Sequence, residues 1–308
     1  MSTFEQPETT PEPLSPRTLT EVGERPHARP PGTALAAGEL LAGRYRIVRF
    51  VAGGGMGEVY EAEDALLREP VAVKLLRAEL VKKPGAQERF ADEIRLARRV
   101  THPNVCRVFD VGIDGERVFF TMELHHGITL AEHLAATGPL DPPDATPLVR
   151  QLLLALGAAH AADVVHADLK PSNVLLTGKG HERVVITDFG LAVPCCSELG
   201  CGCDMPHLLG TPAYMAPEQV AGGLAGESTD MFALGVILFE MTTGLRPYRG
   251  PDAFTVARAR LSGAAPSPRV LRPDLPESWD RVIRACLARE PAARPQSTAD
   301  VAGALGIA

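Results

Sequence analysis

The sequence contains no apolar run near the ~20 consecutive residues that a membrane-spanning helix needs. Its most apolar stretch, Met231–Met241, is much shorter. A secretory signal peptide is also missing, because Glu5, Glu8 and several prolines stand where such a signal has a positive charge followed by an apolar block. We therefore expect a soluble cytoplasmic protein that does not associate with membranes.

An excess of positive charge is absent as well. The 31 Lys and Arg residues are outnumbered by 38 Asp and Glu residues, which gives a formal net charge of −7. Such a chain has no general electrostatic attraction to the phosphate backbone of nucleic acids. The sequence thus predicts no nucleic-acid partner, and it leaves the oligomeric state open.

Cysteine is scarce, and four of the six cysteines lie in one short segment. We expect the two single ones, Cys106 and Cys286, to be small core residues. A reducing compartment argues against structural disulfides, so the cluster suggests a metal clip, a thiol switch or no specific role. In zinc sites the ligating cysteines are usually separated by about two to four residues, and this cluster has a different spacing. A bound Zn²⁺ ion is therefore speculative, and we favour the alternative that the cluster has no specific role. The clustered residues are Cys195, Cys196, Cys201 and Cys203.

The chain divides by composition into a leader and one two-lobed domain. Residues 1–40 are rich in Pro, Glu, Thr and Ala and are predicted to be disordered. In the first lobe, residues 41–124, alternating and β-branched patterns predict five strands and a single helix at residues 86–100. The strands are expected at residues 45–51, 58–63, 71–76, 105–111 and 118–124.

The second lobe, residues 125–308, is predicted to be mainly helical. The apolar spacing indicates an amphipathic helix over 148–162 and an apolar one over 228–243. Shorter helices are expected near Phe254, Trp279 and Val301, and the Pro-rich residues 264–276 read as a surface connection. The fold class is therefore α+β, with a small antiparallel β-sheet lobe that carries one helix and a larger α-rich lobe.

The most informative segment is His166–Asn173 (HADLKPSN), which is followed after an apolar run by Asp188–Gly190 (DFG). Phosphoryl transfer needs an aspartate that accepts a hydroxyl proton, a lysine that steadies the transferred group, and oxygen ligands that hold magnesium. These segments supply all of them on neighbouring loops. The candidates are Asp168, Lys170, Asn173 and Asp188.

A glycine-rich turn in the first lobe suits a nucleotide. Without a Cβ atom at Gly54 and Gly57, backbone N–H groups can approach phosphate oxygens closely. Taken alone, this spacing is equally common in ordinary hairpin turns.

Lys74 lies on the strand that follows the turn, where its ammonium group could reach the α- and β-phosphates. A partner is expected on the helix at 86–100. We predict Glu93 in this role, with Glu88 and Asp92 as alternatives.

Together these motifs resemble the eukaryotic-type (Hanks-type) serine/threonine protein kinases of bacteria, over Arg44–Ala308. The resemblance extends to Gly210–Glu218 (GTPAYMAPE), the segment that seats the substrate peptide in that family, and to Asp230 and Arg294. It implies a protein-kinase fold and a non-specific serine/threonine protein kinase with protein substrates. The implied cofactors are ATP and Mg²⁺, with Mn²⁺ as an alternative metal.

The resemblance also implies individual roles. Asp168 is the catalytic base, Lys170 contacts the γ-phosphate, and Asn173 and Asp188 bind Mg²⁺. Met122 is the gatekeeper that begins the adenine hinge. Asp230 anchors the catalytic loop, and Glu218 pairs with Arg294. The implied ATP-binding residues are Val51, Gly54, Gly57, Val59, Ala72, Lys74, Glu93, Met122, Glu123 and Leu124.

The chain departs from the family pattern in three places. Ala52 replaces the first glycine of the turn, so we expect an altered nucleotide affinity. Ala167 replaces the arginine that grips a phosphate on the activation loop. The only hydroxyl residue between Gly190 and Gly210 is Ser197. We therefore hypothesise a kinase that does not need phosphorylation of this loop.

The sequence leaves two other functions open. A small-molecule kinase would accommodate Ala167, but the segments 170–172 and 210–218 suit a protein hydroxyl substrate better. A pseudokinase, which binds nucleotide or partners without turnover, is supported mainly by Ala52. It is disfavoured because every residue needed for phosphoryl transfer is present.

Overall fold

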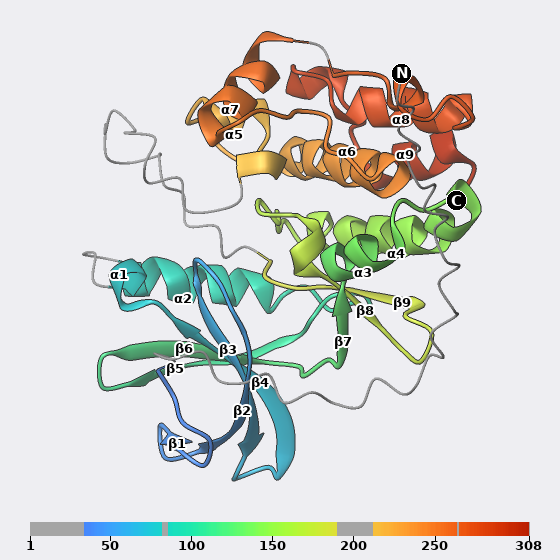
Figure 1. Cartoon of the computed structure of the whole chain (residues 1–308). Coiled ribbons are helices and arrows are strands. Elements are labelled where there is room, and N and C mark those ends of the chain that lie inside the picture. The colour runs from blue at the N-terminus through green and yellow to red at the C-terminus, as the bar shows by residue number, and fades with distance from the viewer. Residues whose placement is uncertain (1–33, 82–85, 190–211, 264, 308) are drawn as a thin grey trace, which may run out of the picture. The chain divides into compact units, whose positions relative to one another are not determined.

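The computed structural model describes residues 34–81, 86–189, 212–263 and 265–307, and residues 34–308 form one compact unit. Its N-terminal lobe is built on a six-stranded antiparallel sheet with the order β1-β2-β3-β4-β6-β5 (Figure 1). The five strands expected from the sequence are present, and β1 is an additional strand of two residues. The strands are β1 (Leu40–Leu41), β2 (Tyr45–Gly53), β3 (Gly57–Asp64), β4 (Glu69–Leu76), β5 (Val108–Asp114) and β6 (Arg117–Met122).

Alternation along β4 separates two apolar cores on the two faces of this sheet. Val71, Val73 and Leu75 pack on one face with residues of the neighbouring strands. Ala72 belongs to the other face, which packs against α2 (Ala86–Ala97), the single long helix that the sequence predicts here. A short helix, α1 (Ala78–Val81), precedes it. Successive strand side chains point to opposite faces, so Lys74 lies on the same face as Ala72.

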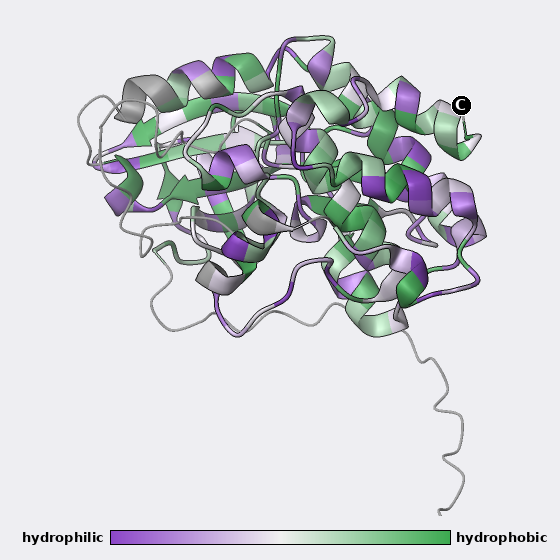
Figure 2. Cartoon of the chain, turned by 90° about the horizontal axis from the view of Figure 1, so that it is seen from above, coloured by the Kyte–Doolittle hydropathy of each residue, from purple (hydrophilic) through white to green (hydrophobic). Residues whose placement is uncertain are grey.

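The remaining chain forms a mainly helical lobe around α6 (Glu227–Thr243), which is buried almost all round as expected for an apolar helix. Figure 2 shows that the outer elements mix apolar and hydrophilic residues, which is typical of elements with one buried face. No helix within the described ranges is long and apolar enough to cross a membrane. The other helices are α3 (Leu130–Thr137), α4 (Pro142–His160), α5 (Pro217–Val220), α7 (Ala253–Ser262), α8 (Glu277–Cys286) and α9 (Thr298–Leu305).

A second sheet of three short strands, which the sequence did not predict, places the loops of the site. It consists of β7 (Gly127–Thr129), β8 (Val174–Thr177) and β9 (Arg183–Ile186). The end of β9 is fixed to the segment before β5, because Ile186 O accepts a hydrogen bond of 2.8 Å from Cys106 N and Ile186 N donates one of 2.8 Å to Asn104 O. Asp188 follows two residues later.

The two single cysteines are core residues, as predicted. Cys106 is 7% exposed and Cys286 is 0% exposed. Burial raises the pKa of both thiols, that of Cys286 to about 12, so both stay protonated at neutral pH.

Candidate active site

The catalytic-loop candidates lie in mutual contact between α4 and β8. Lys170 Nζ lies 2.6 Å from Asp168 Oδ2. Asn173 Nδ2 donates to the backbone oxygen of Asp168 at 2.9 Å and to its Oδ2 at 3.3 Å. The side chains of Asp168 and Lys170 keep 14% and 15% of their surface exposed, so a reactant can reach the carboxylate.

A carboxylate on α6 accepts hydrogen bonds from the backbone of this loop. Asp230, which is completely buried, accepts the backbone N–H groups of His166 and Ala167, each at 2.9 Å. His160 Nε2 at the end of α4 lies 2.8 Å from its Oδ2. All the contacts come from groups that can donate, so the charge of the buried carboxylate is compensated.

The ring of His166 links the loop to the segment that carries Asp188. Its Nδ1 accepts the backbone N–H of Asp168 at 3.2 Å, so Nδ1 is unprotonated. Nε2 then carries the proton and donates it to Thr187 O at 2.9 Å. The ring also packs on Phe189, with 4.7 Å between ring centroids. The neutral tautomer therefore fixes both loops.

Lys74 meets Asp188 directly. Their Nζ and Oδ2 atoms are 2.6 Å apart, and the lysine side chain is 6% exposed. The side chain of the predicted partner, Glu93, lies outside the described residues. Asp92, one alternative partner, instead pairs with Arg95 at 2.7 Å. Asp188 has a φ of 64°, a left-handed conformation that is uncommon outside glycine and occurs often at functional sites.

The donor chemistry of Asn173 and Asp188 fits a magnesium ion. Because Nδ2 of Asn173 is used by Asp168, the amide oxygen of Asn173 is its group suited to a cation. Mg²⁺ typically takes one or two protein oxygen ligands together with substrate phosphates and water. In keeping with such a sparse site, no group of three or more potential ligands from His, Cys, Asp and Glu occurs among the residues that the structure covers. The four clustered cysteines lie outside those residues.

The glycine turn between β2 and β3 uses its glycines for different reasons. A Cβ atom on Gly57 would lie 2.0 Å from the carbonyl oxygen of Leu75 on β4, so this position requires glycine for packing. A Cβ on Gly54 would meet nothing within 4 Å, which leaves room beside its backbone. The turn is closed by a hydrogen bond of 2.8 Å from Gly54 N to Gly57 O. Ala52 precedes it in β2 and pairs with Val59.

Four of the predicted ATP-binding residues lie in the apolar cluster on the α2 face of the sheet. Ala72 and Met122 are directly opposite each other on β4 and β6, and Val59 and Leu124 pack against the same cluster. Val51 lies partly buried in β2. In the predicted hinge, Glu123 N donates to Arg107 O at 2.9 Å, so this amide is already used within the protein.

The same cluster includes residues that were not predicted to lie near the nucleotide, among them Cys106, Leu175 and Val185. Leu175 and Val185 lie on β8 and β9, so they bring the helical lobe into the same apolar group. The sequence does contain a signal for these two strands, because apolar and β-branched residues flank residues 178–182 on both sides. The strands predicted from the sequence do not include them.

The segment that begins at residue 212 is fixed by an ion pair between a buried arginine and a partly buried glutamate. Arg294 donates to both carboxylate oxygens of Glu218, at 2.7 and 2.8 Å, and Thr229 Oγ1 donates to Oε1 at 3.0 Å. Burial is the largest single influence on the Glu218 carboxyl and would raise its pKa, but the hydrogen bonds and charge of Arg294, a backbone N–H and the Thr229 hydroxyl together lower the pKa below its ordinary value. The Glu218–Arg294 pair expected from the resemblance is therefore present.

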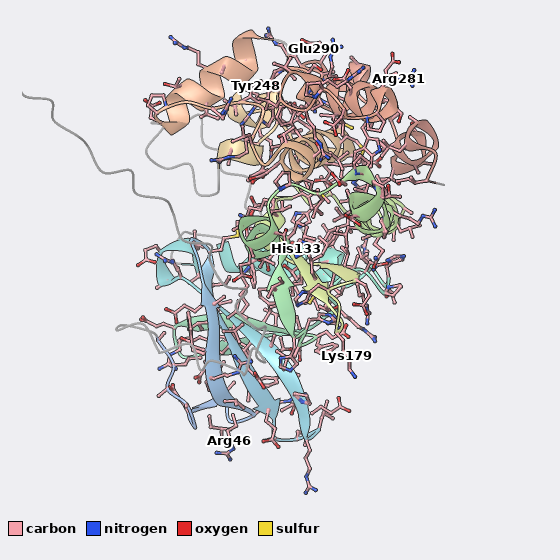
Figure 3. The ribbon with its side chains drawn as sticks, turned by 45° about the vertical axis from the view of Figure 1, so that its right-hand side comes forward. Arg46, His133, Lys179, Tyr248, Arg281 and Glu290 are labelled. Carbon is pink, nitrogen blue, oxygen red and sulfur yellow. The ribbon has the colours of Figure 1, made fainter. Side chains whose placement is uncertain are left out.

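A second buried arginine, not predicted from the sequence, holds the same segment. Arg260 on α7 is 0% exposed and donates to Ala213 O at 2.8 Å. Its guanidinium group lies 5.7 Å from the ring centroid of Phe232 and 5.5 Å from that of Tyr248, which is labelled within the helical lobe in Figure 3. Burial lowers the pKa of Arg260 to about 10, so it remains charged at neutral pH.

Comparison with known proteins agrees with this geometry. Residues 45–302 match the family model of the protein kinase domain. The chain is 36% identical over 270 residues to the serine/threonine-protein kinase PrkC of Bacillus subtilis and 39% identical over 263 residues to PknH of Mycobacterium tuberculosis. These alignments cover 87% and 85% of this chain but only 41% of each relative, so the chain spans less than half the length of either.

The solved structures agree as well. The PknI kinase domain of Mycobacterium tuberculosis is similar with a TM-score of 0.72 and 29% identity, in an alignment that covers 89% of this chain and 98% of that one. These findings confirm the two-lobed fold class and the resemblance drawn from the sequence motifs.

Proposed function

Because the chain belongs to the protein kinase family, we propose that it transfers the γ-phosphoryl group of ATP to serine or threonine hydroxyls of protein substrates. The observation that carries this proposal is the contact group Asp168–Lys170–Asn173, held from α6 by Asp230 and joined through His166 to the loop of Asp188. We assign the domain to residues 41–308, with residues 1–40 as a leader.

Asp168 acts as the catalytic base in this proposal. Its carboxylate orients the acceptor hydroxyl and takes its proton as the hydroxyl oxygen bonds to the γ-phosphorus. The bond from the γ-phosphorus to the oxygen that bridges it to the β-phosphate breaks, and ADP leaves with that electron pair. Lys170, 2.6 Å from Asp168, is placed to stabilise negative charge on the transferred phosphoryl group.

Asn173 and Asp188 would hold the magnesium ion. When bound, Mg²⁺ supplies positive charge that neutralises the phosphate oxygens. Lys74 binds Asp188 in the structure, and in the complex its ammonium group is shared with the α- and β-phosphates. The two residues therefore tie the phosphate groups to both lobes.

The nucleotide is assigned to the α2 face of the sheet. Gly54 and Gly57 allow the turn to approach the phosphates. Ala72, Val59 and Met122 supply an apolar surface for the adenine ring, and the backbone of Glu123 and Leu124 forms the hinge. Most nucleotide pockets combine such an apolar lining with a few convergent polar groups.

We further propose that activity does not require phosphorylation of the loop before residue 212. Ala167 has no guanidinium group that could bind a phosphate. The segment that follows the loop is instead held by unmodified arginines, through Arg260 to Ala213 and Arg294 to Glu218. Mass spectrometry of active protein after phosphatase treatment checks this: activity should persist without phosphate, and a large rate increase on stoichiometric Ser197 phosphorylation would contradict it.

The decisive experiment is transfer of label from ATP, with Mg²⁺, to myelin basic protein or casein. We expect transfer by the wild type and a loss of about a hundredfold or more in Asp168→Asn and Lys74→Met, which are both expected to keep the wild-type circular dichroism spectrum. Phosphoamino-acid analysis should show phosphoserine or phosphothreonine. Nucleotide binding without transfer to any acceptor would instead support the pseudokinase.

A further inference from the structure

A glutamine on α5 connects the catalytic loop to the segment before α5. Gln219 Nε2 donates to the backbone oxygen of Ala167 at 2.8 Å, and Gln219 Oε1 accepts the backbone N–H of Ala216 at 2.9 Å. One side chain thus uses both ends of its amide to join two main-chain segments that lie 49 to 52 residues apart in the sequence.

Ala167 is the residue directly before Asp168, and its backbone is unusual. Its φ of 61° lies in the left-handed region, which a residue with a Cβ adopts only where its surroundings enforce it. Its N–H is held by Asp230 and its carbonyl by Gln219. Both polar groups of the strained residue are therefore fixed by side chains of the helical lobe, whereas its own methyl group can supply no such contact.

The segment that carries Gln219, residues 213–219, is also fixed by side-chain contacts. Ala213 is anchored by Arg260, the Tyr214 hydroxyl donates to Glu240 on α6, and Glu218 is bound by Arg294. The segment 213–219 is thus attached to the helices α6 and α7 and to the loop before α9. Gln219 is the contact through which this fixed segment reaches the residue next to Asp168.

We propose that Gln219 is a positioning residue for the phosphoryl-transfer step. Gln219 holds the carbonyl of Ala167 and so fixes the turn that orients the Asp168 carboxylate. Through its second hydrogen bond it keeps this turn at a fixed position relative to the segment proposed to seat the acceptor peptide. The inference rests on the proposed kinase function and deepens it: two neutral hydrogen bonds supply the coupling that the family pattern assigns to an arginine and a loop phosphate.

Two substitutions separate the parts of the bridge. Gln219→Met keeps the length of the side chain and removes both hydrogen bonds. Gln219→Glu keeps an acceptor for Ala216 N–H and removes only the donor to Ala167. The control is Gln151→Met, because Gln151 on α4 also bonds backbone groups through both ends of its amide, from Nε2 to Glu182 O at 2.8 Å and from Val184 N to Oε1 at 2.9 Å. Its Oε1 accepts from Asn104 Nδ2 as well, at 2.9 Å, and its Nε2 lies 3.2 Å from Pro147 O, so Gln151→Met removes more hydrogen bonds than Gln219→Met does.

We expect both Gln219 variants to lower kcat by about tenfold while the KM for ATP stays at the wild-type value. Gln151→Met should lose at least as much thermal stability but keep the wild-type kcat. Equal kcat in Gln219→Glu and the wild type would overturn the proposal, because the Ala167 contact would then be dispensable. A parallel loss in Gln151→Met would overturn it too, since the effect would be one of stability.

A second measurement does not depend on turnover. Amide hydrogen exchange at residues 166–168 should become about tenfold faster in both Gln219 variants and remain unchanged in Gln151→Met. If the wild type transfers no phosphate, the proposed function fails, and the exchange result still decides whether Gln219 holds the loop. Unchanged exchange in both Gln219 variants would overturn the inference.

Discussion

Each lobe contains a buried carboxylate that holds two backbone N–H groups, and the two differ in what they hold. In the sheet lobe, Asp64 accepts the N–H groups of Leu66 and Leu67, at 3.0 and 3.3 Å, and the guanidinium of Arg44. In the helical lobe, Asp230 accepts those of His166 and Ala167, which precede it by more than sixty residues. The first carboxylate closes a local turn, and the second sets the loop of the proposed catalytic base.

The difference shows where the proposed active-site geometry is fixed. Asp64 lies at the end of β3 and Gly57 at its start, so the turn that Asp64 closes is at the opposite end of the strand from the glycine turn. Asp230 contacts the residue next to Asp168. We infer that the same chemical arrangement contributes to stability alone in the sheet lobe and to both stability and chemistry in the helical lobe.

Among the changes that compare the two lobes, Asp230→Asn is expected to have the largest effect. The isosteric amide keeps one oxygen but places an NH₂ group among donors, which should destabilise the fold by about 2 kcal/mol. A shift by a fraction of an ångström of the turn before Asp168, the proposed catalytic base, should lower turnover by about a hundredfold. Urea unfolding and steady-state kinetics measure the two effects.

Asp64→Asn is the matched variant in the other lobe. It should cost a similar free energy of unfolding, about 2 kcal/mol, because it also leaves donors without a charged acceptor. Turnover under folding conditions should stay at the wild-type value. A drop in kcat as large as that of Asp230→Asn would show that the two lobes do not differ in the way we infer.

The same contrast explains how much could be predicted from the sequence. The spacing from His166 to Asp188, the alternation of β2 to β4 and the apolar pattern of α6 depend on local sequence, and each predicted its element. The contacts of Gln219 with Ala167 and of Arg260 with Ala213 join distant segments. No local pattern encodes them, because one polar residue on an amphipathic helix looks the same whether it is solvated or buried against a carbonyl.

Short elements were missed for a related reason. The two residues of β1 are too few to show a period of two, and the four residues of β8 and of β9 form apolar runs too short to distinguish a strand from a buried helix segment. The fold class did not depend on them. The apolar surface proposed for adenine does depend on these strands, because Leu175 and Val185 come from them.

The second prediction compares two glycines of one turn. Gly57→Ala should destabilise the protein by about 2 kcal/mol, because the added methyl group would overlap the carbonyl of Leu75. Gly54→Ala meets nothing and should change the free energy of unfolding by about 0.5 kcal/mol or less, while it weakens ATP binding. Thermal unfolding with and without ATP separates the packing role from the nucleotide role. Equal destabilisation by both would contradict this division.

The third prediction uses pH to test the carboxylate of the sheet lobe. The hydrogen bonds from Arg44 lower the pKa of Asp64, so the stability it contributes is present above its unfolded-state pKa of about 3.9 and is lost as pH falls through the lower folded-state pKa. The advantage of the wild type over Asp64→Asn in urea should therefore be constant above about pH 5 and shrink below about pH 4. An advantage that is the same at pH 3 and pH 7 would rule out the ionised carboxylate as its source.

The smallest effect is expected at Ala52, the residue that replaces the first glycine of the family's turn. Ala52 lies in β2, is paired with Val59, and does not have a positive φ, so its backbone does not require glycine. Ala52→Gly should cost about 0.5 kcal/mol of stability and change the affinity for ATP by less than about threefold. Isothermal titration with ATP and Mg²⁺ measures the affinity. A much larger gain in ATP affinity would mean that the methyl group of Ala52 limits how closely the turn approaches the phosphates. A side chain of the sheet lobe would then influence the proposed site directly, as Asp230 does in the helical lobe.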